Sequence, residues 1–324
     1  MTRAGSVEPL PEGSAPPRRP WRRWLFAALS IAIVVALAFR FPWHRTLDAI
    51  LSEDPRLLAA AFAVNLLSLV AKGWAWQLLL RPGARWRTAQ EATLAGAAVT
   101  NVSVSVTGEA ARVAYMVSHD RLPLTRTISA VALSRTLEGI ALFIFLVAAP
   151  LLIDMPPILH RVHIVGVVGL GAALLVAAYG HKLPMPKRIR HAARELAHTL
   201  REHAGPAWLA WPGVLAIVNW ATQWATFWFA LAAFHVPHPA GASFTALVLT
   251  NLSGIPRISP GNVGVFQGAL VVALLPFDVS AERAIAAGLA IQALQIVPVQ
   301  AAAMILFGWR GLVSTAKAKP AQAE

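Results

Sequence analysis

Long apolar runs, separated by short polar stretches, make up most of this chain. Several runs reach the roughly 20 residues that a helix needs to cross the hydrocarbon core of a bilayer. The pattern therefore predicts an all-α, polytopic membrane helical bundle of about eight spans. The predicted spans are Leu25–Phe39, Leu57–Leu80, Ile128–Ile153, Val162–Tyr179, Trp208–Phe234, Ala242–Ile255, Val263–Pro276 and Ala284–Phe307.

Two apolar segments are interrupted by polar and helix-breaking residues. Thr250–Leu275 is apolar at both ends, but its middle contains two prolines, four glycines and Arg257. Irregular backbone is tolerated at membrane depth only against protein or a water-filled cavity, and such interruptions point to the binding site of a transporter. The second segment, Ala92–Val106, is short for a span. Both segments are therefore expected to belong to a polar cavity inside one bundle.

The distribution of basic residues predicts the topology. Arginines and lysines precede the first span, follow the last span and fill the loop between Tyr179 and Trp208. Basic residues collect on the cytoplasmic side of a membrane, so both termini and this loop are predicted to be cytoplasmic. The prediction holds only if residues 92–107 form a re-entrant or broken segment that enters and leaves on one face. A Thr-Asn-x-Ser sequence at 100–103 and again at 250–253 suggests an inverted repeat, with coincidence as the alternative.

Composition supports the membrane class and limits the chemistry. The 324 residues are 57% hydrophobic and 13% charged, whereas soluble domains are nearer one quarter charged. The net charge of +13 is attributed to cytoplasmic loops that contact anionic lipid headgroups, not to nucleic acid binding. The predicted organisation is a disordered cytoplasmic tail at 1–20, one transmembrane domain at 21–310 and a second cytoplasmic tail at 311–324.

Motifs of known catalytic or metal chemistry are missing from the sequence. It contains no cysteine, no phosphate-binding Gly-rich loop with Lys-Ser/Thr, no HExxH and no Gly-x-Ser-x-Gly. The histidine pairs His160/His163 and His235/His238 are expected to be solvated in loops. The chain is therefore predicted not to be an enzyme and to hold no metal and no cofactor.

Charged residues inside membrane spans are costly and are functional candidates by default. Arg135 and Glu138 lie three apart within one predicted span, and Glu109 and Arg112 have the same spacing just after the re-entrant segment. The pair Arg135/Glu138 is expected either to bind substrate or to form a structural ion pair. The second pair forms an anion site at a helix start or a cytoplasmic salt bridge. Lys72, in the second span, is expected to reach the membrane interface by snorkelling, with a functional role as the alternative.

The centre of the second interrupted segment is the other candidate site. The stretch after Arg257 predicts a turn that starts a new helix, whose free amides at 261–263 could bind an anion. A kink needed only for packing is the alternative. Polar pairs at helical spacing, Asn219/Gln223 and Gln292/Gln295, are expected to form hydrogen bonds between helices.

Three stretches, LSRTLEGIALFIFL, VTGEAARVAYM and ISPGNVGVFQGALVVALL, resemble the transmembrane, flippase-like domain of the lysylphosphatidylglycerol synthase family, also called uncharacterised protein family 0104. The resemblance covers about Leu57–Gly308. It implies a domain that moves aminoacylated phosphatidylglycerol between leaflets, while a separate C-terminal domain makes that lipid. That C-terminal domain is expected to be absent here, since the chain ends shortly after Arg310. Gln267 stands where many relatives carry glutamate, which removes a charge from the expected cavity.

These observations lead to one main hypothesis and two alternatives. The chain is expected to be a multi-pass lipid transporter of the bacterial inner (plasma) membrane that moves an anionic or phosphate-bearing lipid, either a phospholipid or a polyprenyl-phosphate. The alternatives are a membrane-embedded transferase, or its lipid-presenting subunit, acting on polyprenyl-phosphate or glycolipid, and a scaffold for a partner transferase. The expected substrate-binding residues are Asn101, Glu109, Arg112, Arg135, Glu138, Asn251, Arg257, Pro260, Gly261, Asn262, Gly264 and Gln267.

Overall fold

A computed structural model describes residues 54–102, 107–153, 157–179, 206–254 and 260–308, all within the unit His44–Glu324. Every regular element in these ranges is a helix, and they contain no strand, so the predicted all-α fold class is confirmed. The predicted first span Leu25–Phe39, the basic loop after Tyr179 and both tails lie outside the described residues.

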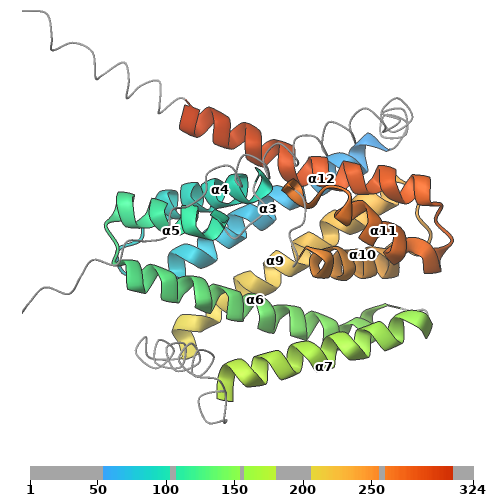
Figure 1. Cartoon of the computed structure of the whole chain (residues 1–324), viewed down its shortest axis with the longest axis horizontal. Helices are drawn as coiled ribbons and strands as arrows, with labels where there is room; N and C mark the ends of the chain where they lie inside the picture. Colours follow the sequence, from blue (N-terminus) through green and yellow to red (C-terminus); the bar gives the residue numbers. More distant parts are fainter. Residues whose placement is uncertain (1–53, 103–106, 154–156, 180–205, 255–259, 309–324) are drawn as a thin grey trace, which may run out of the picture. The chain divides into compact units, whose positions relative to one another are not determined.

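The described helices fall into two length classes (Figure 1). The long helices are α3 (Pro55–Leu79), α6 (Leu124–Leu152), α7 (Pro157–Tyr179), α9 (Pro206–Ala233) and α12 (Ala281–Ala303). The shorter helices are α4 (Trp86–Val102), α5 (Thr107–Asp120), α10 (Pro239–Ser253) and α11 (Val265–Leu274). Single turns complete the set: η2 (Pro260–Asn262), η3 (Leu275–Phe277) and η4 (Met304–Gly308).

The predicted number of crossings is not confirmed by the helix lengths. Four described helices, α3, α6, α9 and α12, are long and apolar enough to cross a membrane. Helices α10 and α11 were expected to be separate crossings, but their lengths of about 22 and 15 Å fall short of a hydrocarbon core of about 30 Å. They contact each other as a hairpin instead. A hairpin returns the chain to the side from which it entered, as two crossings would, so the expected side of the termini is unchanged.

Helices α4 and α5 form the first hairpin, as expected for a re-entrant or broken segment. Two glycines allow a very close approach: a Cβ at Gly96 would lie 2.9 Å from the carbonyl oxygen of Gly108, and one at Gly108 would lie 1.8 Å from Oγ1 of Thr100. At the opposite end, the amide of Arg85 donates to a carboxylate oxygen of Asp120 at 2.8 Å. The two helices are therefore antiparallel along their full length.

The second hairpin turns through η2, between α10 and α11. Gly261, Asn262 and Gly264 have φ values of +61°, +58° and +86°, in the left-handed region that glycine adopts without strain. A Cβ at Gly261 would lie 3.2 Å from the carbonyl oxygen of Asn101 in α4. The two interrupted segments, far apart in sequence, therefore meet at the tips of their hairpins.

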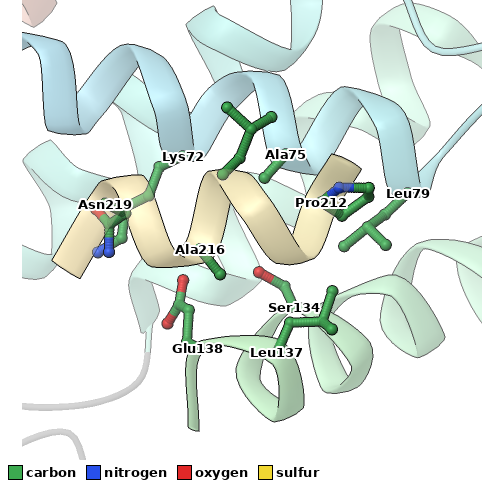
Figure 2. A pocket seen from close by; sticks show the side chains of 10 residues that line it. Lys72, Ala75, Leu79, Ser134, Leu137, Glu138, Pro212, Ala216 and Asn219 are labelled. Atoms are coloured by element: carbon green, nitrogen blue, oxygen red, sulfur yellow. The ribbon is translucent and has the colours of Figure 1, made fainter. Parts of the chain in front are cut away.

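The order long helix, hairpin, long helix occurs twice in the described chain. We call α3–α6 the first half and α9–α12 the second half. Helices α3 and α9 pack against each other, and Figure 2 shows Asn219 beside Lys72 but Pro212 beside Leu79, so the two helices run in opposite directions. Ser68 donates to Asn219 across this contact at 2.7 Å, and each is the fourteenth residue of its helix. Contact between matching positions of antiparallel helices is the geometry of an inverted repeat.

The two halves differ in what they bury. The second half contributes most of the largest apolar cluster, whose fully buried members include Phe227, Phe234, Leu247, Leu270 and Ile291. The first half has a smaller cluster around the buried Trp76, Leu80, Met116 and Leu133. The apolar core is therefore concentrated in the second half.

Prolines inside two long helices are compensated by side chains from neighbouring helices. Pro298 removes the amide that would bond the carbonyl of Leu294, and Asn65 of α3 donates to that carbonyl at 3.0 Å. Pro150 of α6 is compensated in the same way by Nε2 of His163 at 2.6 Å. His163, expected in a solvated loop, thus lies in α7 and bonds α6. These bonds satisfy backbone groups that lipid could not.

Candidate functional site

Five charged residues from α3, α5 and α6 form one group, which we call the charge cluster: Lys72, Glu109, Arg112, Arg135 and Glu138. The sequence predicted two separate pairs, and the structure joins them. Arg135 forms ion pairs with Glu109 and, at 2.8 Å, with Glu138. Nη1 of Arg112 lies 3.8 Å from Oε2 of the same Glu109. Glu109 therefore connects the two predicted pairs.

Local helix geometry explains this placement. Glu109 lies in the first turn of α5, where the helix dipole stabilises a negative charge. Arg112 follows one turn later on the same face, and Arg135 and Glu138 share a face of α6 by the same three-residue spacing. The close approach at Gly108 holds the start of α5 against α4.

Arg112 is the most enclosed cation of the ion-pair network, with a side chain only 9% exposed. Its guanidinium carbon lies 4.0 Å from the centre of the Trp76 ring, a cation–π contact. Nε and Nη2 of Arg112 and Oε2 of Glu109 are buried and have no hydrogen-bond partner. Buried polar groups without partners are costly and rare, so donors left free on a charged side chain mark a place where a ligand could bind.

Lys72 is the member that sequence reasoning missed. The structure places it inside the bundle, where it lines a small cavity with Glu138, Ser134 and Asn219, between α3, α6 and α9 (Figure 2). The cavity of about 10 Å³ has room for about one water molecule. The spacing of Ser68 and Lys72, four apart and thus on one helix face, was the signal available in the sequence.

Helix α9 also supports Glu138 directly. Nε1 of Trp220 donates to the backbone carbonyl oxygen of Glu138 at 2.9 Å, so the long helix of the second half is bonded to the charged face of α6. Asn219, one residue earlier, bonds Ser68 of α3. The three long helices around the cavity are therefore joined by polar contacts that do not involve the charged side chains.

The second half contains a neutral group of hydrogen bonds, which we call the amide cluster. Gln267 accepts from the amide of Gly264 at 2.7 Å and donates to the side-chain oxygen of Gln292 at 2.7 Å. Gln292 in turn donates to the carbonyl oxygen of Gly261 at 2.8 Å. Both amide groups of this pair are occupied by these bonds. Gln267, expected to offer a hydrogen bond to substrate, is therefore engaged in capping α11 and in joining it to α12.

The two clusters occupy matching positions of the repeat. Glu109 and Gln267 are each the third residue of their helices, α5 and α11. Arg135 and Gln292 are each the twelfth residue of theirs, α6 and α12. Counted in the same way, the counterparts of the five charges are all uncharged: Gln223, Gln267, Leu270, Gln292 and Gln295. The ion pairs of the first half thus correspond to amide hydrogen bonds in the second.

The remaining expected site residues lie near the hairpin tips. Asn101 is in the last turn of α4, against the turn of the second hairpin, and Pro260 begins η2. Asn262 has a buried side-chain oxygen without a partner, whereas Asn251 donates to a carbonyl of its own helix at 2.8 Å. Arg257 lies outside the described residues. The structure does not gather these residues into the charge cluster.

A comparison with protein families identifies the membrane domain. The model described as the lysylphosphatidylglycerol synthase TM region matches residues 24–303, a range that includes both clusters and both hairpins. A comparison with curated proteins finds no match. The family match agrees with the resemblance drawn from the sequence motifs.

Proposed function

Since the chain belongs to the lysylphosphatidylglycerol synthase TM family, a family of membrane proteins linked to lipids, we propose that it is a flippase-type transporter of a phosphate-bearing lipid. The observation that carries this proposal is the charge cluster, with its free donors on Arg112. The proposal includes a bacterial inner membrane as the location and cytoplasmic termini.

The position of the charges supports transport through the bundle. Lys72, Arg135 and Glu138 lie within helices that are long and apolar enough to cross a membrane. Ionised groups at such positions are rare and usually face a pathway or a ligand. A guanidinium with free N–H groups suits a phosphate, because it can donate two parallel charge-assisted hydrogen bonds.

In this proposal, the structure corresponds to a closed state of the site. A cavity with room for about one water cannot hold a lipid headgroup. The headgroup would enter only if α3, α6 and α9 separate or if a hairpin moves. Hairpins whose tips meet, in two inverted halves, suit a mechanism in which one half rocks against the other around a fixed site.

Reconstitution of the full chain into liposomes tests the proposal. Two lipids labelled on their hydrocarbon chains, a phospholipid on an acyl chain and a polyprenyl-phosphate on its isoprenoid chain, are followed by quenching of the outer leaflet with an impermeant reductant. We expect the protein to speed the loss of inner-leaflet signal for at least one of them. Arg112→Leu, which installs the residue of the matching position in α11, should abolish the acceleration. The control Arg283→Gln removes an exposed arginine of α12 and should not.

Two results would count against a flippase. Folded protein that accelerates none of the lipids beyond empty liposomes would overturn the proposal. Consumption of a sugar or aminoacyl donor by the purified protein would favour the membrane-embedded transferase instead.

A further inference from the structure

The charge cluster is not balanced. Ion pairs join Arg112 and Arg135 to Glu109 and Glu138, and Lys72 lines one cavity with Glu138, so three cations and two carboxylates leave the ionised cluster with one excess positive charge. The other side chains that line the cavity, such as Ser134 and Asn219, are neutral. An uncompensated charge inside a membrane protein is costly.

The other acids near the first hairpin do not supply the missing negative charge. Glu91 accepts from Arg87 at 3.0 Å and from the hydroxyl of Tyr115 at 2.7 Å. Asp120 is bonded by Arg85 at 2.7 Å, at the base of the hairpin. Each of these two acids already forms an ion pair with an arginine outside the charge cluster. In the part of the chain that the structure describes, no further carboxylate joins the cluster.

We propose that this imbalance sets the substrate class: the site accepts a lipid whose headgroup carries a net charge of −1, a phosphodiester without an amine, in preference to a zwitterionic phospholipid. This inference rests on the proposed function and narrows it. A phosphodiester of charge −1 neutralises the cluster, whereas a zwitterion brings its own cation and leaves the excess charge in place. Lys72 is the residue that determines this specificity.

Three observations select Lys72 among the cations. Arg135 is engaged by both carboxylates, and Arg112, stacked on an indole ring, offers the donors for the phosphate itself. Lys72 lines the cavity without an ion pair to either carboxylate, and its ammonium is a compact charge on a flexible stem. Its counterpart in α9, the eighteenth residue of that helix as Lys72 is of α3, is Gln223. The scaffold thus accepts a glutamine at this position.

The test measures the rate ratio of two lipids in the same liposomes, phosphatidylglycerol (net −1) and phosphatidylcholine (net 0), with the same acyl-chain label. For the wild type we expect a ratio of roughly ten or more, the scale of leaving one buried charge unpaired. Lys72→Gln makes the cluster neutral and should bring the ratio to about one by slowing phosphatidylglycerol. Lys72→Arg keeps the charge and should keep the preference. Arg56→Gln, which removes an exposed charge from the same helix, should also keep it.

A second variant tests the charge rule in the opposite direction, by raising the positive charge of the cluster. Glu138→Gln raises the excess to two positive charges and should shift the preference toward phosphatidic acid, a phosphomonoester that carries more negative charge. A wild type that moves both lipids equally, or a Lys72→Gln variant that keeps the preference, overturns the charge rule. If the wild type moves no lipid at all, the proposed function fails. Binding of the two lipids to the purified protein, measured as a shift in thermal unfolding, then decides the charge rule by itself.

Discussion

The two halves of the repeat join the hairpin to the following long helix at the same positions, but with different side-chain chemistry. In the first half, the third residue of α5 and the twelfth residue of α6 are the ion pair Glu109 and Arg135. In the second half, the same positions of α11 and α12 are Gln267 and Gln292, joined by a hydrogen bond of 2.7 Å. Neutral amides therefore suffice to join a hairpin to the following long helix. The charges of the first half are not needed for that joint, which is the reason to assign them to a ligand.

The first test of this comparison makes the first half resemble the second. The double variant Glu109→Gln, Arg135→Gln should keep the hairpin joined through an amide pair, as in the second half, while the charges that order Arg112 disappear. Lipid movement in liposomes should fall roughly 30-fold or more, because the buried Arg112 loses its carboxylate partner Glu109. Thermal unfolding in detergent should shift little. A variant that unfolds readily would show that the ion pairs stabilise the fold. The amide pair of the second half would then no longer be a reason to assign the charges to a ligand.

A second comparison uses one glycine of each hairpin. Gly108→Ala places a Cβ 1.8 Å from Oγ1 of Thr100 and 2.5 Å from the carbonyl oxygen of Gly96, so α4 and α5 must separate. Overpacking of this kind should destabilise the protein by about 3 kcal/mol. In α11, Gly268→Ala meets no atom within 4 Å and should be neutral or slightly stabilising. Chemical denaturation in detergent micelles measures both, and equal effects would contradict the tight first hairpin.

The amide cluster should matter for stability more than for transport. Gln292→Leu leaves the donor of Gln267 and the carbonyl of Gly261 without partners, and should cost about 2 kcal/mol of unfolding free energy. The matched control is Gln295→Leu, which changes an amide of the same helix outside the cluster. If Gln292→Leu instead leaves stability unchanged and abolishes lipid movement, the second half has a direct role in the site.

The smallest expected effect is a pH dependence at the base of the first hairpin. Partial burial acts to raise the pKa of Asp120, but hydrogen bonds from Arg85 and Thr88 outweigh it and hold the pKa below its ordinary value of 3.8. The folded state therefore gains stability above that value and loses it as the pH falls through the lowered pKa. The effect should stay below about 1 kcal/mol, because the side chain of Arg85 is 69% exposed and water screens the pair. Stability of Asp120→Asn, measured from pH 6 to pH 2 beside the wild type, should lack this contribution.

Several features could be predicted from the sequence because they depend on neighbouring residues. Apolar length predicted the helices, and the three-residue spacings placed Glu109 with Arg112 and Arg135 with Glu138 on shared helix faces. Proline, glycine and asparagine at residues 260–264 predicted the turn between α10 and α11. A full crossing at residues 92–106, the third along the chain, would have conflicted with the charge distribution, and this conflict predicted that residues 92–107 reverse direction.

Other features required the tertiary structure, because membrane helices are apolar on all sides and their periodicity does not show which face is buried. That is why Lys72 was placed at the interface by sequence reasoning and inside the bundle by the structure. The pairings Glu109–Arg135 and Gln267–Gln292 join residues 26 and 25 positions apart, and only helix packing brings them together. The sequence by itself determined the helices, their charges and the two interruptions. Packing decided that the charges form one unbalanced cluster in the first half, because only the fold sets the rotation and neighbours of each helix.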